Sequence, residues 1–358
     1  MIDKIVRCSK CILPATTPEI EFDNNGICSY CMNYKPMEVK GEGKLSMELE
    51  KYRSVNGKYD CMVSISGGRD STYTMWKMVN DYGLKVLATN YKNPFTSEQA
   101  SENIENTVKS LGIECIYWEF PNDVHRKDTV KALKTWLHHP SASMIPIICS
   151  HCKSWWPTFF RLARENGIKL IVIGSNPLET ASFKQAGFGG ARTYHKLSKI
   201  PGFAVKVLKE LLKNPRYLTH CSYGPIFKAY FMASHSSPYL KWMYKDITVI
   251  RLFDYIKWNE KEVHSVITSK LDWKKSPESE SSWRFDCRLD YVRRLMYSST
   301  VGVSELQDLM SKMIREGQIS REEALHRLES EDMVKTEVVE DVLDGLGMNM
   351  KDLKLNIG

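Results

Sequence analysis

The sequence predicts an α/β fold, a doubly wound and mostly parallel sheet with a cysteine-rich segment before it and a helical region after it. Between residues 59 and 174, four strand-length apolar segments are separated by helix-length segments. This alternation favours parallel strands with helices on both faces. Two C-x-x-C pairs occupy the first 31 residues, and helical periodicity returns from residue 304. We therefore expect four regions, at 1–35, 55–190, 191–250 and 251–358.

The composition is that of a globular protein. The chain has 358 residues, of which 42% are apolar and 26% charged, so it is about two domains long and not extensively disordered. No run of about 18 apolar residues is present, and we expect no membrane-spanning helix. The N-terminal residues MIDKIVRCSKC carry charges where a signal peptide has an apolar core. We therefore expect a cytoplasmic protein whose ten cysteines are free or metal-bound rather than paired in disulfides.

The first four cysteines have the spacing of a zinc ribbon. Cys8-x2-Cys11 is followed, after sixteen residues, by Cys28-x2-Cys31, and each C-x-x-C knuckle directs two thiolates at one ion. An intervening Asn-Gly dipeptide suits a turn between two short strands. Two unrelated thiol pairs or a redox C-x-x-C are the alternatives. Matched spacing in a segment poor in apolar residues favours a structural Zn²⁺ site, closed to catalysis.

The central region is expected to alternate strands and helices. Apolar segments predict strands over 59–66, 84–90, 113–120 and 169–174, and helices over 70–83, 97–112, 123–137 and 154–166. After about residue 191 the alternation stops, and AVKVLKELLK is the one short amphipathic helix expected there. Three helices are expected at the end, over 304–317, 320–332 and 335–347, the second opening with the capping box of Ser320 and Glu323.

The segment SGGRDST, residues 66–72, joins the first expected strand to the first expected helix. Two glycines allow a sharp turn and close approach of the backbone to a ligand. Hydroxyl groups and free N–H groups at the start of a helix favour an anion. The segment lacks the GK[ST] of a Walker loop, and an ordinary glycine-rich turn is the alternative. A phosphate-binding loop is our interpretation.

This loop resembles the SGGxDS pyrophosphate-binding loop of ATP pyrophosphatases, which include asparagine and GMP synthetases and tRNA thiolases. The resemblance implies a Rossmann-like PP-loop domain that cleaves ATP between the α- and β-phosphates with Mg²⁺. It places the pyrophosphate over Gly67 and Gly68, with hydroxyl contacts from Ser66, Ser71 and Thr72.

Two charged residues of the loop would be catalytic by the same resemblance. Asp70 matches the acidic residue of the family, which orients ATP or is linked to Mg²⁺. Arg69 stands where the family usually has lysine; it keeps the charge and adds a planar fork suited to phosphate.

The resemblance also implies nucleotide contacts at the ends of two other strands. Asn90 follows the second expected strand and would contact adenine or ribose. Gly174, Ser175 and Asn176 follow the fourth and would line the nucleotide or an adenylated intermediate, with Glu179 nearby. A plain turn at the Asn-Pro pair is the alternative.

Longer stretches resemble the N-acetyl sugar amidotransferases of bacterial surface-polysaccharide biosynthesis, including that of lipopolysaccharide O-antigen: CSKCILPATTPEIEFDNNGICSYC, SISGGRDSTY, GSNPLET, SSWRFDC and MIREGQISREEAL. The resemblance implies ATP-dependent, ligase-like conversion of the N-acetyl group of a nucleotide-linked sugar into an acetamidino group. The amide oxygen would attack the α-phosphorus, pyrophosphate would leave, and ammonia would displace AMP. No glutaminase motif is recognisable, so a separate glutaminase subunit is implied as the ammonia source. A tRNA thiolase and a non-catalytic nucleotide-binding scaffold are the alternatives.

A second C-x-x-C pair, Cys149 and Cys152, precedes an expected helix. With Cys287 or Cys221 it could hold a second metal or an iron–sulfur cluster, as in some tRNA thiolases of the superfamily. A redox pair, thiols lining the active site, or an unliganded helix start are the other readings, and His151 between the cysteines could be a ligand or a proton-transfer group.

Arg284 is the candidate substrate-binding residue. It could clamp a phosphate or carboxylate of a nucleotide sugar, because a guanidinium binds such groups through two parallel hydrogen bonds. A surface ion pair with Asp286 is the alternative.

The net charge of +7 is concentrated in one segment. Residues 191–250 hold ten basic and two acidic side chains, a net charge of +8, interleaved with aromatic residues. RNA, a nucleotide sugar, an anionic membrane surface and the glutaminase are all conceivable partners of such a segment. Because the rest of the chain is nearly neutral, we favour docking of substrate or a protein partner, with peripheral membrane contact as an option, over nucleic-acid binding.

Overall fold

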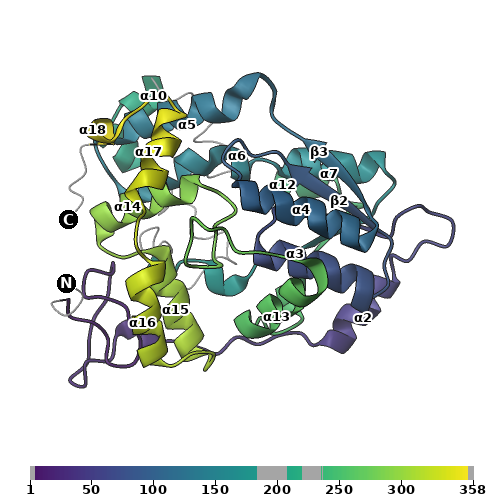
Figure 1. Ribbon diagram of the computed structural model, residues 1–358, viewed down its shortest axis with the longest axis horizontal. Coiled ribbons are helices and arrows are strands. Elements are labelled where there is room, and N and C mark those ends of the chain that lie inside the picture. The colour runs from purple at the N-terminus through teal and green to yellow at the C-terminus, as the bar shows by residue number, and fades with distance from the viewer. Residues whose placement is uncertain (1–4, 184–207, 220–234, 236, 354–358) are drawn as a thin grey trace.

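The structure, a computed structural model, describes residues 5–183, 208–219, 235 and 237–353. Its centre is a five-stranded sheet (Figure 1) with strand order β3-β2-β1-β4-β5. All four strand pairings are parallel. The strands are β1 (Cys61–Ser64), β2 (Val86–Tyr91), β3 (Glu114–Trp118), β4 (Leu170–Ile173) and β5 (Thr248–Arg251). The doubly wound parallel fold expected from the sequence is confirmed.

Helices cover both faces of the sheet because neighbouring strand residues point to opposite sides. On one face, Cys61 and Val63 pack with α3 (Arg69–Trp76), α4 (Glu98–Leu111) and α13 (Glu260–Leu271). On the other face, Met62 packs with α7 (Trp156–Glu165) and α12 (Pro238–Met243). All of these strand residues are buried, as expected for a parallel sheet.

The remaining helices lie before, between and after these elements. They are α1 (Ser29–Met32), α2 (Glu42–Glu50), η2 (Lys77–Asp81), η3 (Pro121–Asp123), α5 (Val124–Trp136), η4 (Ala142–Cys149), α6 (Ser150–Lys153), η5 (Pro177–Glu179), α10 (Arg216–Thr219), η7 (Leu252–Asp254), α14 (Leu289–Val301), α15 (Glu305–Arg315), α16 (Arg321–Glu331), α17 (Thr336–Asp344) and α18 (Met350–Leu353).

Strand β5 was not expected from the sequence. It pairs with β4 from Leu170↔Thr248 to Ile173↔Arg251, so the boundary placed at residue 250 falls inside a strand of the central sheet. The four expected strands and the helices α4, α5 and α7 lie where periodicity predicted them. The capping box is present in its first half, since the Ser320 hydroxyl accepts a hydrogen bond from the Glu323 N–H at 3.0 Å.

The N-terminal segment packs against the C-terminal helices rather than forming an isolated unit (Figure 1). Cys8, Cys11 and Leu13 belong to one buried cluster with side chains of α5, α14 and α17. The guanidinium of Arg321 donates hydrogen bonds to the carbonyls of Cys8 and Cys11 at 3.2 and 3.0 Å. The first and last parts of the described chain are therefore held together by packing and hydrogen bonds.

Much of the basic segment lies outside the described residues. Of its ten basic residues, Arg192, Lys196, Lys199, Lys206 and Lys228 fall in the undescribed ranges, as does Cys221. Residues 208–213, part of the amphipathic helix expected from AVKVLKELLK, are helical. Tyr217 on α10 is buried in the same cluster of apolar side chains that contains Cys8, Cys11 and residues of α5, α14 and α17.

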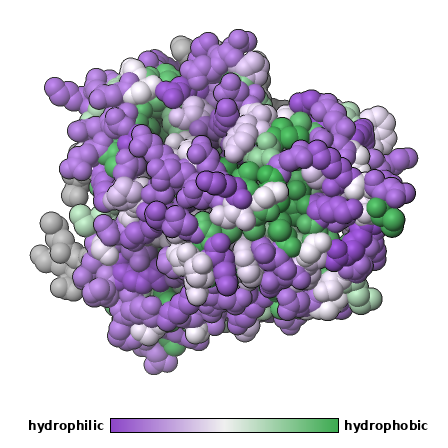
Figure 2. Space-filling model, turned by 45° about the vertical axis from the view of Figure 1, so that its right-hand side comes forward, coloured by the Kyte–Doolittle hydropathy of each residue, from purple (hydrophilic) through white to green (hydrophobic). Residues whose placement is uncertain are grey.

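Among the described residues, no helix is both long and apolar enough to cross a bilayer. Figure 2 shows one face of the molecule, on which hydrophobic side chains gather toward the middle and hydrophilic ones surround them.

Candidate functional site

The glycine-rich loop lies between β1 and α3, at the carboxyl edge of the sheet. The chain crosses from β3 to β4 on the other side of β1, so this edge is the switch point where parallel α/β sheets bind ligands. The loop is closed by short polar contacts: the Ser71 hydroxyl accepts a hydrogen bond from the Ser66 N–H at 3.1 Å and donates to the Gly68 carbonyl at 3.1 Å. The backbone N–H groups at the start of α3 are thereby held in a turn suited to an anion.

Two glycines around the loop are required by close backbone contacts. Gly67 has φ +79°, and a Cβ there would lie 2.1 Å from the Ala100 carbonyl oxygen. Gly174 follows β4, where a Cβ would lie 2.5 Å from the Asp70 carbonyl oxygen. Both strand ends therefore approach their neighbouring helices without room for a side chain.

A cavity of about 650 Å³ opens at this edge of the sheet, within the range of small-molecule sites. It brings together most of the site residues expected from the sequence. These are Ser66, Gly68, Arg69, Asp70, Ser71, Asn90, Cys149, Cys152, Gly174, Ser175, Glu179, Arg284 and Cys287.

Three expected site residues do not line the cavity. Gly67 belongs to the loop but not to the cavity lining, and its carbonyl accepts a hydrogen bond from the Trp273 indole at 2.9 Å. Thr72 is fully buried within α3. Asn176 is buried and its side chain caps η5 by accepting from the Leu178 N–H at 2.9 Å. These three residues support the segments that line the cavity and do not line it themselves.

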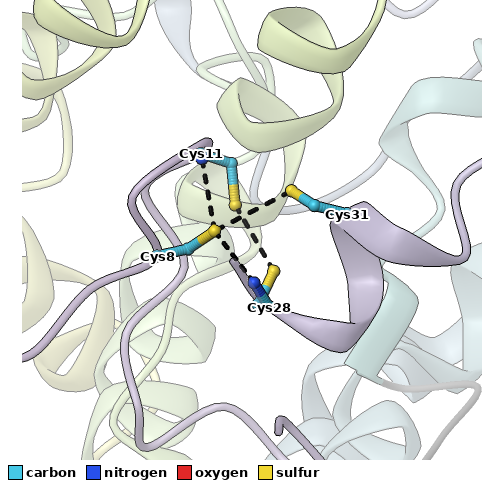
Figure 3. A group of neighbouring side chains, drawn as sticks. All are labelled: Cys8, Cys11, Cys28 and Cys31. Carbon is cyan, nitrogen blue, oxygen red and sulfur yellow. Dashed lines mark hydrogen bonds between the residues drawn. The ribbon is translucent and has the colours of Figure 1, made fainter. Parts of the chain in front are cut away.

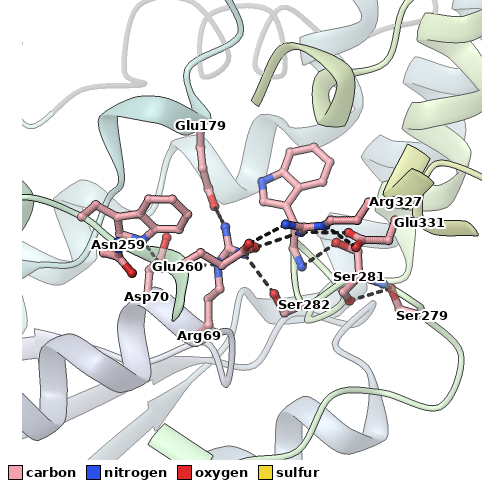
Figure 4. A network of polar contacts seen from close by, with 12 residues as sticks. Arg69, Asp70, Glu179, Asn259, Glu260, Ser279, Ser281, Ser282, Arg327 and Glu331 are labelled. Atoms are coloured by element: carbon pink, nitrogen blue, oxygen red, sulfur yellow. Dashed lines mark hydrogen bonds and ion pairs between the residues drawn. The ribbon is translucent and has the colours of Figure 1, made fainter. Parts of the chain in front are cut away.

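Arg69 lines the cavity, and its guanidinium is engaged by acidic side chains that the sequence did not predict as its partners. It is buried, and its guanidinium nitrogens lie 2.8 Å from Glu260, 3.3 Å from Glu179 and 3.4 Å from Asp70 (Figure 4). It also lies over the Trp258 ring, 4.8 Å from its centroid. Two of these carboxylates accept hydrogen bonds from the guanidinium, so Arg69 anchors the loop to η5 and α13.

The network continues from Arg69 into the C-terminal helices. Glu260 is also held by Arg327 of α16 at 2.8 Å, and Arg327 pairs with Glu331 at 2.7 Å (Figure 4). The pKa of Glu260 is lowered despite burial, because both arginines stabilise its carboxylate. The glycine-rich loop is thus connected to α13 and α16 by partly buried ion pairs.

Replacing Arg69 by methionine is expected to destabilise the fold by about 3–5 kcal/mol, because removing one partner of a buried ion pair leaves its carboxylates uncompensated. Urea unfolding followed by circular dichroism measures this. Lys51→Met is the matched control, since Lys51 pairs with Glu48 at the surface and such pairs contribute below about 1 kcal/mol. A loss in Arg69→Met no larger than that of the control would contradict the anchoring role.

Asp70 and Asp286 place two carboxyl groups beside the phosphate loop. Asp70 accepts a hydrogen bond from the Trp258 indole at 2.9 Å, and burial raises its pKa to about 7, with nearby Glu179 adding to the rise. A Cβ on Gly68 would lie 3.2 Å from the Asp286 carboxyl group, and burial also raises the pKa of Asp286. Carboxyl groups whose ionisation is opposed by burial and by the neighbouring Glu179 are suited to a divalent cation. Asp70 and Asp286 could therefore hold the Mg²⁺ of Mg-ATP.

Arg284 lines the same cavity, as expected for a substrate-binding residue. Its guanidinium lies 3.5 Å from Glu305 and 3.9 Å from Glu179. Its backbone has φ +51°, a conformation that few non-glycine residues adopt. The ion pairs hold the side chain at the cavity, and part of it remains exposed.

Cys149, Cys152 and Cys287 line one wall of the cavity together. The Arg293 guanidinium lies 3.9 Å from the Cys149 sulfur, and the Asn93 amide donates to Cys287 at 3.4 Å. Burial raises the pKa of Cys287 to about 12 and also raises that of Cys152, with the neighbouring cysteines adding to both shifts. His151 points away from this wall, since its Nε2 contacts Asp128 of α5 at 2.9 Å.

The four N-terminal cysteines converge as predicted (Figure 3). All four are buried, and their sulfur atoms lie within 4.8 Å of one another. Arg315 of α15 donates to Cys31 at 3.2 Å and to Cys11 at 3.5 Å, which compensates the negative charge of a metal bound by four thiolates. The donor set and the spacing fit one tetrahedral metal ion. In the part of the chain that is described, no other group of three or more His, Cys, Asp or Glu side chains is gathered in this way.

Sequence reasoning missed several residues of the cavity. Asp286, which lines the cavity, was expected only as a surface partner of Arg284. Glu260 and Trp258, which contact Arg69 and Asp70 beside the cavity, were not expected at all. The aromatic wall formed by Trp118, Trp155, Trp156 and Phe159 was also missed. These residues belong to separate segments, and no spacing rule connects them with the loop.

No family model matches the chain. An uncharacterized protein of Methanocaldococcus jannaschii is 26% identical over 113 residues, which is 30% of this chain and 41% of that protein's length.

Two solved structures are among those similar to this fold. The NMN synthetase from Francisella tularensis has a TM-score of 0.38 at 12% identity, covering 80% of this chain and 91% of that one. The U34-tRNA thiolase from Methanococcus maripaludis, solved with its [4Fe-4S] cluster, has a TM-score of 0.33 at 16% identity, covering 90% and 88%. Because both TM-scores are below 0.5 and both identities are below 25%, these similarities do not indicate a function. The function is therefore inferred from the residues of the site.

Proposed function

We propose that the chain is a PP-loop ATP pyrophosphatase that uses ATP and ammonia to convert the N-acetyl group of a nucleotide-linked sugar into an acetamidino group. The observation that carries this proposal is the SGGRDST loop, placed at the switch point of a parallel sheet and open to a cavity of about 650 Å³. The cavity extends from the loop to a wall of tryptophans and cysteines. It therefore offers room for a second substrate beside ATP.

The loop binds and orients the leaving pyrophosphate. Ser66, Gly68 and Ser71 line the cavity, and the Gly68 N–H and the two hydroxyls would contact the oxygens of the pyrophosphate. Asp70 and Asp286 would hold Mg²⁺, which would supply positive charge beside the phosphates. An amide carbonyl is a poor electrophile, so the acetamido oxygen first attacks the α-phosphorus and pyrophosphate departs. Ammonia then attacks the activated carbon, and AMP leaves with the electron pair of its C–O bond.

The aromatic wall supports a sugar as the second substrate. Trp118 and Trp155 line the cavity and are partly exposed, and an aromatic face packs well against the C–H groups of a pyranose ring. Arg284 and Arg251 line the same cavity and supply positive charge for the phosphates of a carrier nucleotide. A separate glutaminase would supply ammonia in the cell, and free ammonia replaces it in an assay.

The test is incubation with ATP, Mg²⁺, ammonium chloride and a nucleotide-linked di-N-acetylated sugar, followed by mass spectrometry. We expect a product in which one oxygen is replaced by NH, formed together with AMP and pyrophosphate. Glutamine in place of ammonia is expected to give no product unless a glutaminase is added. AMP release that no acetamido sugar stimulates would overturn the proposal.

A tRNA thiolase is the second candidate, favoured by the three thiols that share the cavity with the phosphate loop. Thiolation needs a sulfur carrier at the site of adenylation, and three cysteines could hold an iron–sulfur cluster with one iron open. Visible absorption of anaerobically purified protein, with Cys287→Ser as the matched variant, tests for the cluster. Detection of thiolated tRNA as the product would overturn the proposed sugar reaction and support the tRNA thiolase.

A further inference from the structure

A row of four polar side chains, three of them buried, leads away from the cavity, and the adenylation step uses none of them. Tyr91 ends β2 and lines the cavity. Its hydroxyl lies 2.6 Å from Nδ1 of His125 on α5. The ring of His125 lies 5.0 Å from that of His151, measured between centroids. His151 contacts Asp128 through Nε2 at 2.9 Å.

This arrangement is buried and held from several sides. His125 is 3% exposed, Asp128 6% and His151 0%. The Tyr91 ring stacks on Trp118, with centroids 4.8 Å apart, and Phe95 packs edge-on against His125. Burying polar groups is costly, and apolar side chains would fill this space with less penalty. The free-energy cost of burying these side chains indicates that they have a functional role.

We propose that Tyr91 and His125 accept the proton that ammonia loses when it attacks the adenylated acetamido carbon, a step that rests on the proposed function. In this proposal the Tyr91 hydroxyl donates to Nδ1 of His125, and its oxygen accepts a proton from the side of the cavity that Tyr91 lines. When the nitrogen of ammonia bonds to carbon, its N–H proton passes to Tyr91 Oη and the Tyr91 proton passes to His125 Nδ1. The C–O bond to AMP then breaks, and AMP departs with the electron pair.

The surroundings favour this route over a tyrosinate base. Burial raises the pKa of Tyr91, and nearby Cys152, Cys287, Glu119 and Asp123 raise it further, so the hydroxyl stays protonated and must pass its proton on as it receives another. The Asp128 carboxylate lies one helical turn from His125 on α5 and stabilises the imidazolium that forms. Tyr91 is therefore the catalytic residue, and His125 acts through it. Asp128 and His151 are positioning residues.

The experiment compares two nucleophiles. After hydroxylamine attacks, its adduct is a stronger acid than that of ammonia and loses its proton to water without help. We expect Tyr91→Phe and His125→Gln to lower amidine formation from ammonia about 10²-fold, the size of general-base effects. Sugar-dependent ATP–pyrophosphate exchange and the reaction with hydroxylamine should change less than about 3-fold, since neither needs the base. Tyr117→Phe and His139→Gln, both at exposed positions, are the matched controls.

Equal losses with both nucleophiles would show a merely structural role and would overturn the proposal. The ¹⁵N shift of His125 gives a readout that does not depend on the sugar reaction. A proton on Nδ1 in the resting protein would reverse the hydrogen bond and also overturn it. Absence of sugar-dependent exchange in the unmodified protein would instead overturn the proposed function, and the ¹⁵N measurement would still decide the direction of the hydrogen bond.

Discussion

Asp70→Asn is expected to lower sugar-dependent AMP release by about 10²–10³-fold, the size of losing one electrostatic contact to a transition state. Asp70 stands at the start of α3 beside the pyrophosphate position and is one of the two carboxylates proposed to hold Mg²⁺. Asparagine keeps the shape and can still accept the hydrogen bond that the Trp258 indole donates at 2.9 Å. The loss should therefore be in catalysis and not in folding.

The pH dependence follows from the raised pKa of Asp70, which is about 7 because of burial. Only the carboxylate binds the cation, so ATP–pyrophosphate exchange at limiting Mg²⁺ should rise as the pH increases through about 7. The Asn variant should lose this rise. The effect on stability has the opposite sign: a carboxyl group whose pKa is raised by folding stabilises the folded state at low pH. That contribution is lost as the pH increases from about 4 toward 7.

The measurement is release of pyrophosphate and AMP between pH 5.5 and 9, with Asp81→Asn as the control. Asp81 lies at the end of η2 and pairs with Lys77 at 2.7 Å, outside the cavity. Unfolding by urea verifies that both variants keep their fold. If the activity of Asp70→Asn stays within 10-fold of that of the unmodified protein at every pH, Asp70 is not a catalytic residue.

The sequence was sufficient to predict the parts of the fold that depend on local pattern. Strand β4 was readable from LIVI because a run of branched apolar residues suits a buried parallel strand. The thiol cluster was readable from spacing alone. Strand β5 was missed because only Val249 and Ile250 of its residues TVIR are apolar, and because it follows a segment without clear helical or strand periodicity. A pairing register with β4 is a tertiary property that no local pattern encodes.

The candidate site was predictable where one short segment forms it and not where distant segments meet. The loop from Ser66 to Ser71 folds as its glycines and hydroxyls suggest. The environment of Arg69 depends on Glu179 and Glu260, which lie 110 and 191 positions away in the sequence. From the sequence, a cation beside a phosphate loop indicates phosphate binding. The nearby carboxylates change that role, and only the fold brings them there.

Helix α15 connects the cysteine cluster with the cavity. Near its C-terminal end, Arg315 contacts Cys31 and Cys11. One turn before Arg315, the Lys312 ammonium donates to the Leu178 carbonyl at 3.2 Å. One turn before that, Asp308 accepts from the Ser182 N–H at 2.7 Å. At its first residue, Glu305 pairs with Arg284 and Arg293, both of which line the cavity. The same helix therefore fixes the ribbon and one wall of the site.

If the four N-terminal cysteines bind a metal ion, as their geometry suits, its loss is expected to destabilise the whole chain. Metal binding by a four-cysteine site provides folding free energy of about 10–16 kcal/mol in isolated zinc-finger peptides. In this chain, packing of the N-terminal segment against the C-terminal helices also stabilises the segment, so we expect a smaller effect of metal loss. For Cys8→Ser with Cys11→Ser, we expect loss of bound zinc and a fall in Tm of about 10 °C, corresponding to roughly 5 kcal/mol at about 2 °C per kcal/mol.

Hydrogen exchange shows whether the effect reaches the cavity. Because α15 holds residues 178–182 through Lys312 and Asp308, we expect faster exchange in this segment when the metal is lost, while β1 at the sheet centre stays protected. Cys115→Ser is the control, since Cys115 lies on β3 apart from the ribbon. Arg315→Met should weaken metal retention in the presence of a chelator, because it removes the cation beside the thiolates. Unchanged exchange over 178–182 in the metal-free double variant would show that the ribbon and the cavity are independent.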